Sequence, residues 1–241
     1  MKYKVLSTKK LEPSILEYAK QNDIDIIEQE FISVKPILSH KIQNQIIELV
    51  KSGLLNIVFT SSNAVTTFEN YLHVGDTFYL FDWEIFCLSG KTKEVVLNSR
   101  RLGKNIVGEA ENASNLAKKI IDQKIPEVIF PCGNKRREEL PSLLKNAGIK
   151  VHEIMVYETI ETPTTANDTI DAILFFSPSA VQSFFSVNHL KKSTVCFAIG
   201  KTTAESIADF TGNKIITSES PSQEMMIASV QNYFQNINCY E

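Results

Sequence analysis

Four segments of this sequence recur in the same order later in the chain, and this duplication is the strongest constraint on the fold. Asn56–Phe68 (NIVFTSSNAVTTF) and Ala172–Phe184 (AILFFSPSAVQSF) carry the same residue at six positions. Four matches in one order, at a spacing of about 110 to 125 residues, indicate an internal duplication and predict two similar lobes. The other three pairs are Glu84–Thr92 with Val195–Thr202, Asn105–Ile120 with Lys214–Val230, and Tyr3–Val34 with Val128–Thr159.

Each half alternates predicted strands with predicted helices, which is the pattern of parallel α/β layers. The strands are continuous apolar runs such as IVF, AILFF and CFAI. Such runs are expected when helices cover both faces of a sheet. With 241 residues, of which 43% are hydrophobic, the chain is long enough for two domains with cores of their own.

Two β-rich runs mark the places where the character of the sequence changes. Gly148–Pro163 (GIKVHEIMVYETIETP) is an apolar run that ends at a Thr/Pro breaker. Asp23–Pro36 (DIDIIEQEFISVKP) resembles it, with Glu28 in the position of Glu153. We predict one strand in each run, and we expect the two strands to form a hinge between the lobes, with the working site in the cleft.

Composition excludes several classes of protein. The net charge of −3 and the pI near 5.9 argue against a nucleic-acid partner, because phosphate-binding domains are normally basic. No apolar run approaches the roughly 18 residues that predict a membrane span. The N-terminal segment MKYKVLSTKKLEPS lacks the apolar core of a signal peptide, so we expect a cytoplasmic protein.

The cysteines and histidines show no metal-ligand spacing and no C-x-x-C pair. We therefore predict buried free thiols and no metal site. The cysteines are Cys87, Cys132, Cys196 and Cys239, and the histidines are His40, His73, His152 and His189.

Short polar turns follow the predicted strands, next to predicted helix starts. Backbone N–H groups and hydroxyls at helix N-termini favour an anion. The same residue types are also the usual helix N-caps, so a single turn taken alone is better explained as a cap. Six such turns spread over both halves favour a polyanionic ligand. They are Thr60-Ser61-Ser62-Asn63, Gly90-Lys91-Thr92, Cys132-Gly133-Asn134-Lys135, Ser177-Pro178-Ser179, Gly200-Lys201-Thr202-Thr203 and Ser220-Pro221-Ser222.

The G-K-T triplets are not phosphate-binding loops of the nucleotide type. The glycine that such a loop needs ahead of G-K is absent from both, and no G-x-G-x-x-G occurs. We therefore discount ATP and dinucleotides. No H-E-x-x-H or G-x-S-x-G is present, and Ser7-Thr8 at the first strand end lacks the acidic cluster of a phosphoacceptor domain.

Two further features allow both a functional and a structural interpretation. Lys135, Arg136 and Arg137 can pair with substrate carboxylates, or they can be an ordinary solvated charge run. Tyr157 in the second β-rich run can be a proton donor or simply a half-buried aromatic residue.

Several motifs together resemble the uroporphyrinogen-III synthase family over essentially the whole chain. No single motif is decisive, but their ordered set is specific. The matching segments are F-T-S-x-x-A-V (Phe59–Val65), P-x-G-x-x-x-R-E (Pro131–Glu138), V-Y-E-T (Val156–Thr159), F-x-S-P-S-A (Phe175–Ala180) and A-I-G-x-T-T-A (Ala198–Ala204).

The resemblance implies an α/β fold of two Rossmann- or flavodoxin-like lobes with parallel sheets, joined by a two-strand β-ladder hinge. One lobe would comprise residues 1–35 and 161–241, and the other residues 36–160, with hinge strands at about 30–37 and 154–161 by analogy with the family. The implied reaction closes the linear tetrapyrrole hydroxymethylbilane to uroporphyrinogen III, with loss of water and inversion of ring D through a spiro intermediate. The implied enzyme is a lyase without metal or organic cofactor, and nothing in the sequence demands more than a monomer.

The resemblance also assigns site residues by position. Tyr157 matches the hinge tyrosine proposed to assist departure of the hydroxyl, and Arg137 matches the arginine of the R-E pair. Cys132 and Ser62-Asn63 depart from commoner Arg and Pro-Arg, which favours binding through backbone N–H groups. A two-lobed binding or sensor protein for a polyanionic metabolite is the alternative. Hydroxyls matched to the site are Ser61, Thr92, Ser177, Ser179, Thr202 and Thr203.

Overall fold

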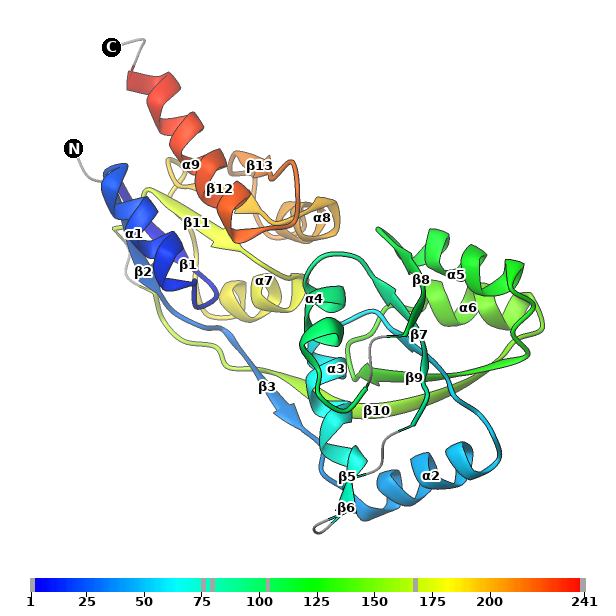
Figure 1. The fold of residues 1–241 in the computed structure, drawn as a ribbon. Helices are drawn as coiled ribbons and strands as arrows, with labels where there is room; N and C mark the ends of the chain where they lie inside the picture. Colours follow the sequence, from blue (N-terminus) through cyan, green and yellow to red (C-terminus); the bar gives the residue numbers. More distant parts are fainter. Residues whose placement is uncertain (1–2, 75–76, 79–80, 103–104, 167–168, 239–241) are drawn as a thin grey trace. The chain divides into compact units, whose positions relative to one another are not determined.

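The computed structural model divides the chain into two compact units, and it describes residues 3–74, 77–78, 81–102, 105–166 and 169–238. Unit 1 comprises Met1–Ser33 and Ile160–Glu241, and unit 2 comprises Val34–Thr159. The chain therefore passes twice from one unit to the other, and each unit is described by itself (Figure 1).

Unit 1 is built on a five-stranded parallel sheet in the order β13-β12-β11-β1-β2. All four residues of β11 and of β12 are buried, because helices cover both faces of this sheet, as the apolar runs predicted. The strands are β1 (Tyr3–Ser7), β2 (Ile24–Glu28), β11 (Ala172–Phe175), β12 (Val195–Ala198) and β13 (Ile215–Thr217).

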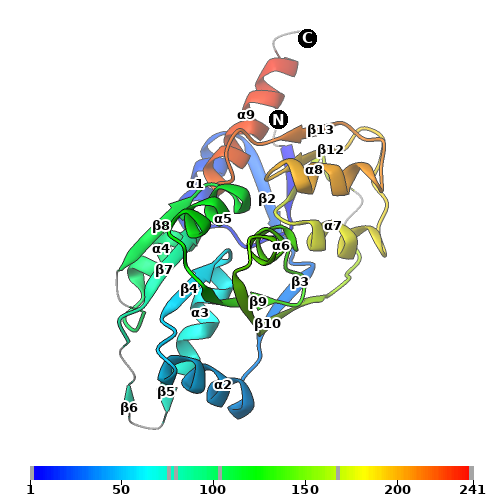
Figure 2. The same cartoon turned by 90° about the vertical axis from the view of Figure 1, so that its right-hand side faces the viewer.

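Two helices lie on each face of this sheet (Figures 1 and 2). Helices α1 and α9 pack on Val5, Leu174 and Phe197, and helices α7 and α8 pack on Leu6 and Phe175 on the other face. The alternation of neighbouring strand residues between faces produces these two cores. The helices are α1 (Pro13–Gln21), α7 (Pro178–Phe185), α8 (Lys201–Ala208) and α9 (Gln223–Asn238).

Unit 2 contains a six-stranded sheet in the order β3-β10-β9-β4-β7-β8, in which β10 to β8 are parallel. Ile57 and Phe59 face one core, and Val58 between them faces the other. The strands are β3 (Ile32–Pro36), β4 (Asn56–Phe59), β7 (Glu84–Leu88), β8 (Ile106–Ala110), β9 (Glu127–Gly133) and β10 (Lys150–Glu161).

The two faces of the second sheet are covered by different helices. Helices α2, α3 and α4 contribute to the core around Phe59 and Phe68, and α5 and α6 to the core around Phe86 and Phe130. Figures 1 and 2 show α5 beside α6. The remaining elements are α2 (His40–Lys51), α3 (Ser62–Glu69), η1 (Asn70–Leu72), β5 (His73–Val74), β6 (Thr77–Phe78), α4 (Lys91–Asn98), α5 (Ala113–Asp122) and α6 (Glu139–Asn146).

The strand orders of the two units are the same once the repeats are matched. In unit 1 the strands run 2-1-3-4-5 in chain order, which is the flavodoxin-like arrangement. Unit 2 has this order after circular permutation, with β9, β10, β4, β7 and β8 in the places of β1, β2, β11, β12 and β13. These pairs are the ones that the repeated segments predicted, so the topology supports an internal duplication and confirms the α/β fold class.

The prediction of one strand in each β-rich run was right for the second run and wrong for the first. Lys150–Glu161 is a single strand, but the first run divides into β2 and β3. Strand β2 pairs with β1 in unit 1, and Phe31 after it is fully buried in that unit's core. Because Phe31 turns inward, the chain leaves the first sheet there and only β3 pairs with β10.

The pairing of β3 with β10 is framed by two backbone hydrogen bonds. The N–H of Thr162 donates to Phe31 O and the N–H of Ile37 donates to Val156 O, both at 2.9 Å. From the first of these bonds to the second, the residue number rises along β3 and falls along β10, so the two strands are antiparallel. Both passages of the chain between the units lie in these two strands.

Cys87, Cys132 and Cys196 are buried and free, as predicted, whereas Cys239 lies outside the described residues. Burial raises the pKa of the Cys87 and Cys132 thiols to about 11 and that of Cys196 to about 12. All three thiols are therefore protonated at neutral pH.

Candidate active site at the carboxyl edges of the sheets

The predicted polar turns follow the carboxyl ends of parallel strands, so within each unit they lie along one edge of the sheet. In such folds ligands bind at this edge, where the strand order reverses. The reversal falls between β1 and β11 in unit 1 and between β9 and β4 in unit 2. The turns after these strands are therefore the first places to search for a site.

Tyr157 lies at the reversal point of unit 2. Its hydroxyl donates a hydrogen bond to Ser61 Oγ at 3.1 Å, and Ser61 lies in the turn after β4, at the N-terminus of α3. The Tyr157 ring also covers Gly133 at the end of β9. Tyr157, Ser61 and Gly133 thus form one cluster, brought together from three segments that are distant in the sequence.

Burial raises the pKa of Tyr157, and the hydrogen bond to Ser61 opposes this effect only in part. Cys132 is close by, but its thiol is protonated at neutral pH because burial raises its pKa to about 11. The Tyr157 phenol therefore keeps its proton at neutral pH. It can act as a proton donor in a partly water-excluded position.

Among the described residues, five helices that follow the carboxyl ends of parallel strands have no side-chain cap at their N-terminus, namely α1, α3, α4, α6 and α8. Three of them begin in the predicted polar turns: α3, α4 and α8, whose N-cap residues are Ser61, Gly90 and Gly200. Gly90 has φ +72°, a backbone conformation that side chains disfavour. Uncapped first-turn N–H groups, together with the helix dipole, bind carboxylates.

The sequence matches the model of a known family over most of its length. A model of the family described as uroporphyrinogen-III synthase HemD matches residues 14–228. This chain belongs to the uroporphyrinogen-III synthase family. Members of the family are lyases of tetrapyrrole biosynthesis, so the expected enzyme class and function are confirmed.

Two solved structures of uroporphyrinogen-III synthases share the fold. The enzyme from Helicobacter pylori is 15% identical with a TM-score of 0.69, over 97% of this chain and 100% of that chain. A mutant enzyme from the extremely thermophilic bacterium Thermus thermophilus is 13% identical with a TM-score of 0.65, over 97% of this chain and 99% of that chain. At these identities the likeness concerns the fold.

Several side chains of the predicted polar turns have structural partners. Both polar atoms of the Asn134 side chain bind the backbone of Thr159. Ser177 Oγ accepts from the N–H of Ala180 and caps α7. Ser222 Oγ accepts from the N–H of Met225 and caps the start of α9. These side chains are therefore engaged in hydrogen bonds within the protein.

Arg136 and Arg137, which follow β9, have different environments. Arg136 forms ion pairs with Glu138 and Glu153, and Lys145 holds the other oxygen of Glu153 at 2.6 Å. Arg137 is exposed and has no partner among the described residues. Arg137, rather than Arg136, is therefore available to a tetrapyrrole carboxylate.

The remaining candidates fall into two groups. Lys91 and Lys201 are exposed and pair with Glu94 at 3.6 Å and Glu205 at 3.9 Å. The other members carry hydroxyl or amide groups without a side-chain hydrogen bond among the described residues: the half-buried Ser62 and Ser179, the exposed Asn63 and Thr202, and the buried Thr92 and Thr203.

The reversal point of unit 1 contains residues that the sequence interpretation missed. Thr8 is buried, and its Oγ1 donates to Leu174 O at 2.8 Å. Beside it the Lys9 ammonium lies 5.9 Å from the centre of the Phe176 ring. The repeat contained the signal, because β1 corresponds to β9, and Ser7-Thr8-Lys9 therefore corresponds to the turn at Gly133.

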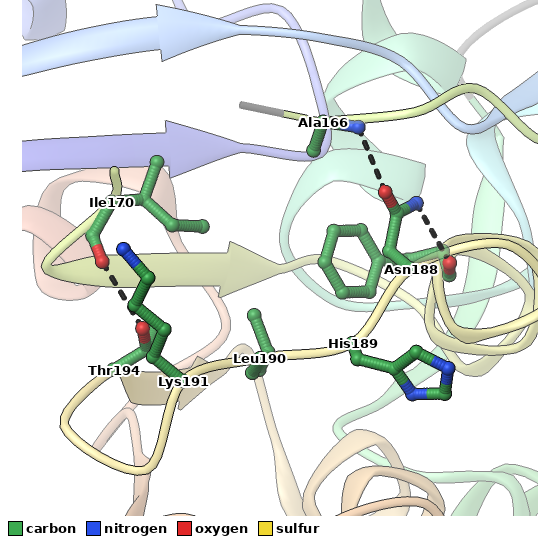
Figure 3. Close-up of a pocket in the computed structure, with 8 residues that line it drawn as sticks. Ala166, Ile170, Asn188, His189, Leu190, Lys191 and Thr194 are labelled. Atoms are coloured by element: carbon green, nitrogen blue, oxygen red, sulfur yellow. Dashed lines mark hydrogen bonds between the residues drawn. The ribbon is translucent and has the colours of Figure 1, made fainter. Parts of the chain in front are cut away.

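A pocket of about 260 Å³ in unit 1 lies away from these turns (Figure 3). Its Ile170 and Thr194 precede β11 and β12, so it is at the amino edge of the sheet. Thr194 Oγ1 donates to Ile170 O, and Asn188 bonds the backbone of Ala166. The pocket contains none of the candidate site residues. Its walls are Ala166, Ile170, Phe184, Asn188, His189, Leu190, Lys191 and Thr194.

No helix within the described parts of the chain has the length and apolar character needed to cross a bilayer.

Proposed function

We propose that this chain closes hydroxymethylbilane to uroporphyrinogen III, with Tyr157 as the proton donor. The observation that carries the assignment of Tyr157 is its protonated, half-buried hydroxyl at the reversal point of unit 2, bonded to Ser61. The family match over residues 14–228 supports the overall reaction.

In the proposed first step, Tyr157 donates its proton to the leaving hydroxyl oxygen of the substrate. The carbon–oxygen bond breaks, water leaves, and a cation remains on the terminal methylene carbon. The substituted carbon of the last pyrrole ring then attacks this cation to form the spiro intermediate. The older bond between this carbon and its other methylene carbon breaks, and that methylene carbon bonds to the free carbon of the same ring, which inverts the ring. Loss of the proton from the newly bonded ring carbon restores the charge balance. General acid assistance of this kind contributes about 10²–10⁴ in rate.

The substrate's carboxylates are proposed to bind chiefly to backbone N–H groups. The uncapped N-termini of α3, α4 and α8 support this assignment. Arg137 is the cation proposed to assist them. The full set of proposed substrate-binding residues is Ser61, Ser62, Asn63, Gly90, Lys91, Thr92, Gly133, Asn134, Arg137, Ser177, Ser179, Gly200, Lys201, Thr202, Thr203 and Ser222.

Binding in this way orients the flexible substrate so that the substituted carbon, not the free one, meets the cation. Strands β3 and β10 are proposed to be the hinge. We further propose that the chain works as a cytoplasmic monomer without cofactor or nucleic acid, and size-exclusion chromatography with light scattering tests whether it is a monomer.

The decisive assay uses freshly prepared hydroxymethylbilane, oxidation of the products to porphyrins, and chromatographic separation of the isomers. The type III isomer should form faster than the spontaneous type I isomer. Type I alone, at the rate seen without protein, would contradict the proposed reaction and would indicate binding without catalysis.

A further inference from the structure

The position of Tyr157 depends on the absence of a side chain at Gly133. A Cβ atom added at Gly133 would lie 2.4 Å from Cζ, 2.5 Å from Cε2 and 2.9 Å from the hydroxyl oxygen of Tyr157. Carbon atoms in contact normally lie about 3.5–4.0 Å apart. The tyrosine ring therefore rests on the glycine backbone, and any larger residue there must displace it.

An irregularity in β10 turns Tyr157 toward this glycine. The register with β9 pairs Met155 with Cys132 and then Tyr157 with Gly133, so that Val156 is the extra residue of a bulge. Successive strand residues normally point to opposite faces. Here Val156 belongs to the core on the α3 side of the sheet, and Tyr157 packs against the same core. Bulges re-aim side chains in this way.

The bulge and the glycine together explain where the phenol hydroxyl lies. The bulge places the ring on the face of the sheet that α3 covers, and Gly133 lets the ring approach the end of β9. The hydroxyl then reaches Ser61 Oγ at the start of α3, 3.1 Å away.

We infer that Gly133 is a positioning residue. Together with the bulge at Val156, it determines where the proton-donating hydroxyl of Tyr157 lies. This inference rests on the proposed role of Tyr157 and gives Gly133 a function other than binding substrate. A side chain at Gly133 would meet the phenol ring of Tyr157 directly.

The first test is the steady-state kinetics of the Gly133→Ala variant of the full chain. A displacement of about 1 Å at a reacting group costs on the order of 10²-fold in rate. We expect kcat to fall about 10²-fold while KM changes less than about threefold, because the proposed carboxylate sites at the N-termini of α3, α4 and α8 remain in place. A kcat within twofold of the wild-type value, in a folded variant, would overturn the inference.

Gly108→Ala is the matched control. A Cβ at Gly108 would lie 2.6 Å from Cδ1 of Phe86, an equally close approach to a buried ring of the same unit, but on the side of the sheet away from Tyr157. This variant should lower the melting temperature and leave kcat near the wild-type value. Equal losses of kcat in both variants would show that general damage to unit 2, rather than the position of Tyr157, is the cause.

A second readout separates the position of Tyr157 from its catalytic role. Ultraviolet titration of wild-type protein minus Tyr157→Phe protein isolates the phenol, whose pKa is raised by burial. The same difference, measured in the Gly133→Ala background, should show a pKa closer to the ordinary tyrosine value. If Tyr157→Phe keeps full activity but this shift occurs, the catalytic proposal fails and the positioning holds. If activity falls in Tyr157→Phe but the titration does not shift, the positioning fails.

The remaining variants cover the case in which Gly133→Ala folds poorly. Adding Gly133→Ala to Tyr157→Phe should not reduce kcat further, since no hydroxyl remains to be placed. Adding it to Tyr157→Leu should not lower the melting temperature further, since the ring is gone. A melting temperature that still falls in the leucine background would show that the clash is not with Tyr157 and would overturn the inference.

Discussion

The side chain of Asn134 binds the backbone of Thr159 at both of its polar atoms. Nδ2 donates to Thr159 O at 3.2 Å, and the N–H of Thr159 donates to Asn134 Oδ1 at 2.8 Å. The amide thereby continues the pairing of β9 with β10 beyond the end of β9 at Gly133. Asn134 is engaged in holding the strand that contains Tyr157.

Replacing Asn134 by Ala should therefore lower stability more than it weakens substrate binding. Two exposed hydrogen bonds are lost, so the free energy of unfolding should fall by about 1–2 kcal/mol, measured by urea denaturation. Asn134→Asp keeps the acceptor and should lose less. A rise in KM above tenfold with unchanged stability would instead indicate that the amide contacts substrate.

Replacing Tyr157 by Phe removes the proposed proton donor and keeps the ring over Gly133. We expect kcat for type III formation to fall about 10²–10⁴-fold. The free energy of unfolding should change by only about 1 kcal/mol, because one hydrogen bond to Ser61 is lost. A loss of rate below threefold would mean that folding of the substrate, without acid assistance, accounts for the reaction.

The two neighbouring arginines should respond differently to replacement by Gln. Arg137 is exposed and without a partner among the described residues, so Arg137→Gln should raise KM several-fold and leave the melting temperature unchanged. Arg136 pairs with Glu138 and Glu153, so Arg136→Gln should lower the melting temperature and change KM little. The opposite pattern would exchange their roles.

Replacing Ser177 and Ser61 by Ala should have different effects, because among the described residues Ser177 caps a helix and Ser61 does not. Ser177 Oγ caps α7, so Ser177→Ala should cost about 1 kcal/mol of stability. Ser61 makes no capping bond within the described chain and accepts from Tyr157, so Ser61→Ala should affect kcat more than stability. Thermal melts and initial rates of both variants test this contrast. Equal stability losses would show that Ser61 is also a cap.

The stability of the fold depends on pH through Glu153, and the partners of this carboxyl determine the direction of the dependence. Burial opposes ionisation of this carboxyl, but Lys145 and Arg136 outweigh burial and lower its pKa. A lowered folded-state pKa stabilises the fold above the unfolded pKa of about 4.3, and this stabilisation is lost as the pH falls through the folded value.

Glu153→Gln should therefore be less stable than the wild type at pH 7, by about 1–2 kcal/mol. The difference should shrink below about pH 4 and vanish when Glu153 is protonated in the wild type. Urea denaturation at several pH values measures it. A difference that stays constant down to about pH 3, below the unfolded pKa, would show that packing, not charge, is responsible.

Repetition within the sequence predicted two similar lobes, and the alternation of apolar strands with helices predicted the α/β fold of each, because helices on both faces of a parallel sheet bury its strands completely. The first β-rich run shows the limit of local pattern. No Gly or Pro marks the break between Glu28 and Ile32, and only the burial of Phe31 in the core of unit 1 ends the first strand there.

The polar turns could be located from the sequence, because helix starts and strand ends have characteristic residues. Their individual roles could not be predicted, because Asn134, Ser177 and Arg136 are of the same residue types as side chains that have no partner within the described protein. Whether each is free depends on partners such as Thr159 and Glu153, which strand register brings within reach.

What the sequence by itself determined is a duplicated chain of alternating strands and helices with polar turns at the strand ends. What only the tertiary structure decided is the orientation of the Tyr157 side chain, which depends on one extra residue in β10 and on the absence of a side chain at Gly133. The physical reason is that periodicity is a property of neighbouring residues, whereas the direction of a side chain depends on contacts between distant ones.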